Sequence, residues 1–338
     1  MLETLHHHFQ AAAISLLTSA PSELFSFAPS AHAITEVIGT STGGGLKDLP
    51  KKIGMVLQLR RKKFDLIVDA SRGHGFIEND IRAFLIGAPI RLGFYQAGAG
   101  FLHTHGIEFQ EDRNVVDKNL DLLESAGIKP KTRDLRIELP PQAVNRARQL
   151  IGHTLQDRLI ITVHAGSKDV TRRWPSSEYA RLIRYILGST NALIFVLGEA
   201  SERSEFEDAS QSMNDERVVN CMGMTTLAES AALISMSHFF IGNDSSLLHV
   251  AIGLGIPLLA VLGPTSPQQI LPSDCESNYI TSCRLVIEGQ TSTSCYNHEP
   301  TFFRAPCIAK PCITGLSAAT VWTSLKPLLV KEHQRINR

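Results

Sequence analysis

The chain has 338 residues, of which 43% are hydrophobic and 20% are charged, so it can form two domains that each bury a core. Its 33 basic residues balance its 33 acidic residues, which excludes a general electrostatic attraction to nucleic acid. No apolar run is long enough to span a membrane, and the opening MLETLHHHFQ lacks the basic start and apolar core of a signal peptide. We therefore expect a cytoplasmic protein.

The first half of the chain combines short apolar runs with one long helical segment. A helix is predicted over Leu46–Lys63, and its basic end, Arg60–Lys63, is interpreted as solvated. Residues 95–112 break the pattern with glycine, histidine and aromatic residues, which predicts a functional loop or a flap. The predicted strands are Ala11–Leu17, Ala33–Ile38, Phe64–Asp69 and Ile90–Phe94.

The second half alternates regularly between short apolar strands and helices. Such short links favour parallel strands with helices on both faces of the sheet, which is the doubly wound α/β class. The predicted strands are Leu159–His164, Ala192–Leu197, Arg217–Asn220, His238–Ile241 and Pro257–Leu262. The predicted helices are Ser176–Leu187, Glu202–Gln211, Thr226–Ser235 and Ser246–Leu254.

A proline pair, Pro140-Pro141, separates the two halves and precedes a predicted helix near Gln142–Gly152. We place a domain boundary there, which gives domains over residues 1–140 and 141–315. The remaining residues, 316–338, contain an amphipathic segment, Ser317–Val330, that is predicted to close the second domain as a helix.

The cysteines are concentrated near the C-terminus, at positions 275, 283, 295, 307 and 312, with one more at 221. No CxxC pair occurs among them. A zinc site formed with His298 is one interpretation, but the irregular spacing favours cysteines that lie in loops and the core.

The first candidate site is the turn after the strand Leu159–His164. Small residues around Gly166 let the backbone approach a ligand closely, and the hydroxyl of Ser167 can donate to a phosphate oxygen. Arg172 adds a cation that can neutralise a diphosphate. The alternative is an ordinary strand–helix turn with a surface arginine.

The second candidate site is the turn after the strand His238–Ile241. Asp244, Ser245 and Ser246 are all residue types that begin helices, and the exposed N–H groups of a helix start attract anions. His249 lies one turn into this helix, where it can meet a phosphate or a sugar hydroxyl. The alternatives are a capping role for Asp244 and a core position for His249.

The two turns together predict a pocket for a nucleoside diphosphate, because the carboxyl ends of parallel strands share one edge of the sheet. Glu202 follows the strand Ala192–Leu197, which lies between these two turns in the sequence. Its carboxylate can accept hydrogen bonds from a ribose or a base, or act only as a first-turn acid of its helix. Neither a GxxxxGK[ST] loop nor a GxGxxG turn after a first strand occurs, so binding is expected to use helix ends and arginine.

The segments HAGSKDVTRRWPSSEYARLI, VLGEASE and FFIGNDSSLLHVAIGLGIPLLAVLGPTSP resemble the donor-domain motifs of glycosyltransferase family 9, which contains the ADP-heptose:lipopolysaccharide heptosyltransferases. A weaker similarity extends over FDLIVDASRG, GAPIRLGF and the tail PCITGLSAATVWTSLKPLL. The resemblance covers nearly the whole chain, and its most specific part is the block that begins at NDSSLLHVA.

This resemblance implies a GT-B architecture, with two facing Rossmann-like domains and parallel sheets. The acceptor would bind the first domain and the nucleotide sugar the second, with no metal or other cofactor. Donor-binding roles carry over to Gly166, Ser167, Arg172, Glu202, Asp244, Ser245, Ser246 and His249. Ser246 departs from the family, in which a glycine is usual, and its side chain would crowd the phosphate or donate to it.

A larger departure from the family lies at the front of the chain. Family members open with a strand and a Gly-Asp turn, whose aspartate is the expected catalytic base. This sequence aligns just after that turn, so the resemblance implies that the strand and the base precede Met1, and that Met1 is an internal methionine. Asp69 is a candidate substitute for the base, although a structural role is favoured for it.

The implied function is inverting transfer of heptose from ADP-heptose to a lipopolysaccharide core acceptor at the inner membrane surface. Two other functions remain open on the sequence. A protein without its base would bind a nucleotide sugar and not transfer it, and a sugar-nucleotide epimerase would convert the donor without an acceptor. An epimerase, however, needs several acids in its cleft that the sequence does not place.

Overall fold

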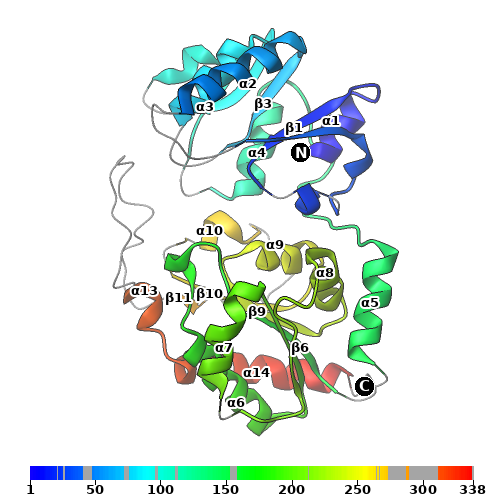
Figure 1. Cartoon of the computed structure of the whole chain (residues 1–338), viewed down its shortest axis with the longest axis vertical. Coiled ribbons are helices and arrows are strands. Elements are labelled where there is room, and N and C mark those ends of the chain that lie inside the picture. The colour runs from blue at the N-terminus through cyan, green and yellow to red at the C-terminus, as the bar shows by residue number, and fades with distance from the viewer. Residues whose placement is uncertain are drawn as a thin grey trace. The chain divides into compact units, whose positions relative to one another are not determined.

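The chain forms two compact α/β units, Met1–Asp134 and Leu135–Arg338, which Figure 1 colours from blue to cyan-green and from green to red. The structure is a computed structural model. It describes residues 1–20, 22–25, 27–40, 48–71, 76–95, 98–110, 113–152, 158–211, 213–263, 265, 267–272, 287–288 and 311–336.

The second unit contains a parallel sheet with the strand order β11-β10-β9-β6-β7-β8. The chain runs outward from β6 in one direction and then returns to the other side of β6 with β9, so the strand order reverses between these two neighbours. Ligands of doubly wound folds bind at the carboxyl ends of the strands at such a reversal. The strands are β6 Ile160–His164, β7 Leu193–Leu197, β8 Val218–Asn220, β9 Phe239–Asn243, β10 Leu258–Leu262 and β11 Ile287–Glu288.

Helices cover both faces of this sheet. One buried cluster joins the sheet to α6 and α14, and the other joins it to α5, α8 and α9. Because both faces are covered, every residue of β6, β7, β9 and β10 is buried. The helices are α5 Pro141–Ile151, α6 Ser176–Ser189, α7 Arg203–Ser210, α8 Leu227–Ser235, α9 Ser246–Gly253, α10 Pro267–Ile270, α13 Pro311–Thr314 and α14 Ala318–Ile336.

Two hydrogen bonds fasten the C-terminal part of the chain to the start of α6. The indole Nε1 of Trp174 donates to the carbonyl oxygen of Leu316 (2.8 Å), and the backbone N–H of Ala318 donates to the Glu178 carboxylate (2.7 Å). Trp174 is buried in the same cluster as α14. The last helix is therefore part of the core of the second unit.

The first unit contains two separate parallel sheets. β1 Ile14–Thr18 pairs with β2 Ile34–Gly39, and β3 Leu66–Asp69, β4 Ile90–Tyr95 and β5 His105–Glu108 form the second sheet in that order. Every residue of β1 and β3 is only half-buried, unlike the central strands of the second unit. The helices are α1 Leu2–His8, α2 Leu49–Arg61, α3 Phe76–Ile86 and α4 Val115–Glu124.

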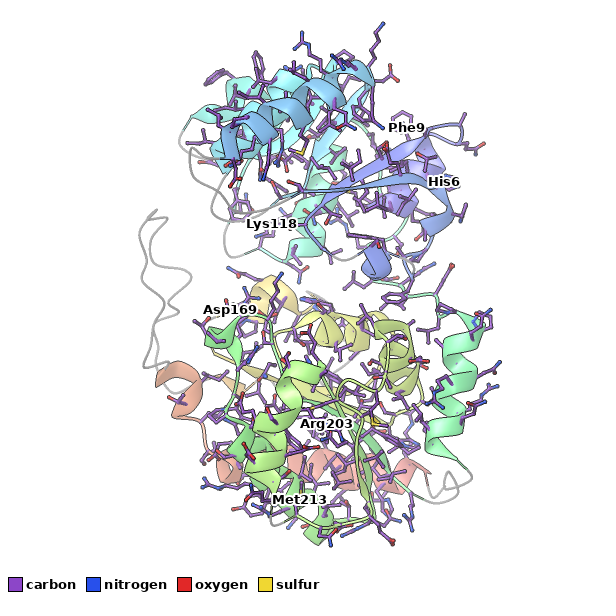
Figure 2. All side chains as sticks on the ribbon, in the orientation of Figure 1. His6, Phe9, Lys118, Asp169, Arg203 and Met213 are labelled. Carbon is purple, nitrogen blue, oxygen red and sulfur yellow. The ribbon has the colours of Figure 1, made fainter. Side chains whose placement is uncertain are left out.

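The strands and helices predicted for the second half are confirmed, with ends that shift by a few residues. The same holds for the four strands of the first half and for the described part of the helix Leu46–Lys63, which begins at Leu49. Among the helices that the sequence did not predict, α3 and α4 both pack against β4. In α4, the amino group of the buried residue Lys118 (labelled in Figure 2) lies 4.2 Å from the centre of the Phe109 ring.

The interpretation of residues 95–112 as a loop was wrong for its middle part, which forms β5 and a 3-10 turn, Ala99–Leu102. The glycines there have a packing role, since a Cβ at Gly106 would lie 2.9 Å from the Tyr95 ring. One histidine of this stretch, His103, is also internal, and its Nε2 lies 3.0 Å from the buried carboxylate of Asp80. Burial raises the pKa of Asp80.

Most of the cysteine cluster lies outside the described residues, as does His298, so the zinc interpretation rests on positions that the structure does not describe. Cys221 is a buried free thiol, and burial raises its pKa. Within the described ranges, no group of three or more histidine, cysteine or acidic side chains could hold a metal ion, and no helix is long and apolar enough to cross a bilayer.

Candidate functional site

Two turns meet at the carboxyl edge of the sheet in the second unit. One follows β6 and leads through a 3-10 turn, Val170–Arg172, to α6, and the other joins β9 to α9. His164 and Gly242 are paired in the parallel ladder, so the turns leave the sheet side by side. This is the point at which the strand order reverses.

Asn243, the last residue of β9, holds the two turns together. Its amide nitrogen donates to the carbonyl oxygens of Ala165 (2.8 Å) and Gly166 (3.2 Å). Its amide oxygen accepts from the backbone N–H of Trp174 (3.1 Å) and the hydroxyl of Tyr179 (2.9 Å). Asn243 is fully buried, so all four bonds form without competition from water.

Asp244 forms the second contact between the turns. Its backbone carbonyl accepts from the Ser167 hydroxyl (3.2 Å), and its buried carboxylate accepts from Arg172 Nη1 (2.9 Å) and from the Thr265 hydroxyl (2.7 Å). The other carboxylate oxygen lies 3.8 Å from Nε2 of His249. Asp244 is therefore the anchor of a polar cluster, and it does not cap α9.

Arg172 is oriented by acids on both turns. Besides its bond to Asp244, its Nε lies 3.5 Å from the carboxylate of Asp169 (labelled in Figure 2). Asp169 also caps the 3-10 turn by accepting from the backbone N–H (2.9 Å) and the hydroxyl (2.7 Å) of Thr171. The guanidinium is thus held at the site as part of an ion pair, with a third of its side chain exposed.

The start of α9 lies beside this ion pair. Ser245 is the N-cap, but its hydroxyl bonds to Nδ1 of His164 (2.9 Å) and forms no bond to the first turn of the helix. Ser246 is the first helical residue and is exposed. His249 is 37% exposed at its side chain and so is not enclosed in the core. The first N–H groups of a helix have no partner within it, so this end attracts anions.

Glu202 lies under the first turn, between two glycines. A Cβ at Gly166 would lie 2.1 Å from its carboxylate oxygens, and a Cβ at Gly198 would lie 2.9 Å from one of them. The carboxylate accepts from the backbone N–H of Glu199 (2.9 Å), and Arg173 Nη2 lies 3.7 Å away. Glu202 therefore caps a turn and also faces the site.

His164 lies between the second turn and Glu202. Its Nδ1 bonds to Ser245, and its Nε2 is 3.9 Å from the Glu202 carboxylate. Burial lowers the pKa of His164 from 6.5 to about 4, and the charge of Arg173 adds to this shift. The imidazole is therefore neutral at physiological pH, and it links the two turns by hydrogen bonding instead of charge.

The structure brings together most of the residues that the sequence predicted for this site. One connected cluster contains Gly166, Ser167, Arg172, Glu202, Asp244, Ser245 and His249, while Ser246 adjoins it at the start of α9. The sequence did not predict the roles of His164, Arg173, Asn243 and Thr265, although all four lie within the motifs that it singled out.

The cluster combines two guanidinium groups with three carboxylates, those of Asp169, Glu202 and Asp244. Paired carboxylates accept hydrogen bonds from hydroxyl groups, while arginine and a helix start favour phosphate oxygens. The arrangement thus suits a ligand that has both hydroxyl and phosphate groups.

Solved structures define the class of fold. The chain is similar to E. coli ADP-heptose lps heptosyltransferase II, with a TM-score of 0.66 and 19% identity over 98% of this chain and 93% of that one. It is also similar to a family 9 glycosyl transferase from Veillonella parvula, with a TM-score of 0.67 and 20% identity over 98% and 92% of the two chains. The fold is the α/β, parallel-sheet GT-B fold, as predicted.

The family follows from the sequence comparisons. The model of glycosyltransferase family 9 (heptosyltransferase) matches residues 55–295, so the chain belongs to that family, as the motifs indicated. Lipooligosaccharide heptosyltransferase 2 of Haemophilus influenzae is 30% identical over 52% of this chain and 53% of that protein. Lipopolysaccharide heptosyltransferase 3 of E. coli is 22% identical over 62% and 63%. The chain thus spans between half and two thirds of these relatives.

Replacing Asn243 with alanine should destabilise the second unit strongly. The change leaves two buried carbonyls, a buried N–H and a buried hydroxyl without their partner, and each such group costs about 1–3 kcal/mol. We expect urea denaturation to show a free energy of unfolding lower by about 3 kcal/mol or more. The control is Asn220→Ala on the less buried β8, where a loss of about 1 kcal/mol is expected. Equal losses would show that Asn243 does not clamp the turns.

Replacing His164 with asparagine should change how stability depends on pH. Because the pKa of His164 is lower in the folded protein, the unfolded chain binds a proton between pH 6.5 and about 4 that the folded protein does not, and stability falls as the pH decreases. At about 1.4 kcal/mol per pKa unit, the wild-type advantage should shrink by about 2 kcal/mol from about pH 7.5 to about pH 5. His7→Asn, on the exposed side of α1, is the control. A constant difference across this range would contradict a buried neutral imidazole.

Proposed function

We propose that this protein transfers heptose from ADP-heptose to a lipopolysaccharide core acceptor, with inversion at the anomeric carbon and without a metal ion. The observation that carries the proposal is the junction of the β6 and β9 turns, where Arg172, Asp244 and the start of α9 lie together. Family membership and the similarity to E. coli heptosyltransferase WaaC with ADP (TM-score 0.64, 16% identity over 98% of this chain and 93% of that one) support ADP as the nucleotide.

In the proposed donor complex, the diphosphate lies against the first turn of α9 and the outer side of Arg172. The guanidinium uses Nη1 for Asp244, and its fork of further N–H groups suits a phosphate oxygen. Ser167 lies on the same turn, although its hydroxyl donates to Asp244 in the unliganded protein. A diphosphate would therefore compete with Asp244 for the Ser167 hydroxyl.

The carboxylates then bind the hydroxyl-bearing parts of the donor. Glu202 lies in the 3-10 turn after β7, on the far side of β6 from β9 and Asp244, so the two acids follow different strands along the sheet edge. We assign Glu202 to the nucleoside, and Asp244 with His249 to the sugar. Gly166 lies between them and leaves room for the Glu202 carboxylate, which a side chain at that position would displace.

In the proposed reaction, a base removes the proton of an acceptor hydroxyl, which attacks the anomeric carbon as the bond to the diphosphate breaks. Negative charge grows on the departing ADP, where Arg172 and the dipole of α9 stabilise it. Asp69 is a weak candidate for the base, because its carboxylate accepts from the backbone N–H (2.9 Å) and the hydroxyl of Ser71 and so stabilises the turn after β3. We assign the acceptor to the first unit and place the protein at the inner face of the cytoplasmic membrane.

Replacing Arg172 with alanine should weaken ADP binding by about tenfold to a hundredfold, since a hydrogen bond to a charged group is worth about 1.5–3 kcal/mol. Isothermal titration calorimetry measures this directly. Adenosine should lose much less affinity than ADP, because it lacks the diphosphate. Arg181→Ala is the matched control, since Arg181 pairs with Glu178 on the outer face of α6.

Two results would count against this assignment. Equal losses for adenosine and ADP would mean that the variant perturbs the site as a whole, through the Asp244 carboxylate left without its arginine. An unchanged affinity for ADP would remove Arg172 from the diphosphate site.

Transfer itself is tested with ADP-heptose and a lipopolysaccharide acceptor that lacks the heptose. We expect a heptosylated product with inverted anomeric configuration by NMR, and an unchanged rate in the presence of EDTA. A further test is Glu202→Gln, which should raise KM for the donor because Glu202 is assigned to the nucleoside. Release of free heptose without transfer, or a rate that EDTA abolishes, would reject the proposal.

A further inference from the structure

The outer helices of the first unit carry an unusual amount of exposed apolar surface. Seven large apolar side chains on α2 and α3 are each between 44% and 56% exposed. They recur three or four residues apart, so they form one stripe on each helix. The stripes consist of Leu49, Ile53 and Leu57 on α2, and Ile77, Ile81, Phe84 and Leu85 on α3.

These stripes are not the core-facing sides of the helices. Leu59 of α2 and Ala83 and Ile86 of α3 are buried, as is Asp80. Each helix thus has one face in the core and a second apolar face outside it. In the second unit, the side chains described for the long helices α6 and α14 include one exposed large apolar residue on each, Tyr185 and Val330. A second apolar face is typical of a docking surface.

The two stripes face the same way. Lys52 Nζ pairs with Glu78 (2.9 Å), and Arg60 Nη1 donates to the carbonyl of Leu85 (2.8 Å), so the helices run in the same direction side by side (Figure 1). Successive residues of a helix are about 100° apart around its axis. Ile53 comes one residue after Lys52, whereas Ile77 comes one residue before Glu78, so the two side chains are turned from the contact sides of their helices by this angle in opposite senses. Since the two contact sides face each other, these rotations bring both stripes to one surface.

This surface, which we call the α2–α3 face, is bordered by positive charge. The segment Leu49–Lys63 contains six basic residues and no acidic one, in a chain with no net charge. Arg60 and Arg61 continue the α2 stripe by one turn. Some of the charge is paired, since Lys51, Lys52 and Lys62 contact Asp48, Glu78 and Glu36 in that order. Within the described ranges, no carboxylate pairs with Arg60, Arg61 or Lys63.

We propose that the α2–α3 face docks on a lipid bilayer that contains anionic headgroups. Apolar side chains would enter the boundary between headgroups and acyl chains, while the basic border contacts lipid phosphates. A second copy of the chain fits less well, because a symmetric contact would bring the basic borders of two copies together. The proposal does not depend on the donor site, and it names the surface through which the proposed membrane location would be achieved.

Vesicle co-sedimentation tests the proposal with the whole chain. We expect binding to vesicles of phosphatidylglycerol and phosphatidylcholine, and much weaker binding to phosphatidylcholine alone. Ile53→Asp combined with Ile81→Asp should lower the partition coefficient at least tenfold, because charged groups resist entry into the interface. The matched control is Val330→Asp combined with Met224→Asp, which changes two equally exposed side chains in the second unit and should leave binding unchanged.

A second pair of variants tests the charge. Arg61→Ala and Lys63→Ala should each lower binding to anionic vesicles by about fivefold, as expected from roughly 1 kcal/mol per basic residue near a membrane surface. Each should have little effect with phosphatidylcholine alone. Should the Asp pair unfold the first unit, as circular dichroism would reveal, the charge variants still decide the question.

Three outcomes would overturn the proposal: no vesicle binding, equal loss in the apolar variants and their matched control, or light scattering that shows the α2–α3 face holding two copies together. ADP binding and vesicle binding measured on the unsubstituted protein separate this proposal from the proposed function. Vesicle binding without ADP binding would count against the donor site alone, and ADP binding without vesicle binding would count against the α2–α3 face alone.

Discussion

The candidate site depends on one buried amide, that of Asn243. Its donors hold the backbone of the β6 turn, and its acceptor holds the turn that enters α6, so both ends of the segment bearing Ser167 and Arg172 are fixed to β9. An aspartate here would lack the donors, and a leucine would lack both functions, so the position demands an amide. The ion pair between Arg172 and Asp244 forms on this frame, because the two residues sit on turns that the amide has already aligned.

The parts of the fold that could be predicted from sequence are those with an uninterrupted apolar pattern. β6, β7, β9 and β10 are buried on both faces, so they stand out as short apolar runs between polar turns. α3 was missed because it is apolar on both its buried and its exposed side, which blurs the helical period. β5 was missed because its glycine serves the packing of Tyr95, a contact between segments that the local sequence does not reveal.

The same limit applies to the site. Residue types and their places after strands predicted that these two turns lie together, because the carboxyl ends of parallel strands share an edge. What could not be predicted is that Arg172 is already paired: its partner is 72 residues away, and so its charge is shared before any ligand arrives. Nor could the role of His164 be foreseen, since it depends on burial and on a bond to Ser245, which follows it by 81 residues. The basic cluster at Arg60–Lys63 was interpreted from the sequence as a solvated helix end, but in the structure it borders the exposed apolar side chains of α2 and α3.

The indole bond from Trp174 to Leu316 ties the segment that bears Arg172 to residues near the end of the chain. During synthesis the ribosome releases the C-terminal residues last, so the β6 turn must wait for more than a hundred residues before its neighbour Trp174 gains this partner. Until then Asn243 can hold the start of α6 to the sheet, but the bond that joins Trp174 to the segment before α14 is absent. A chain that stopped before Leu316 would leave the buried indole N–H of Trp174 without this partner.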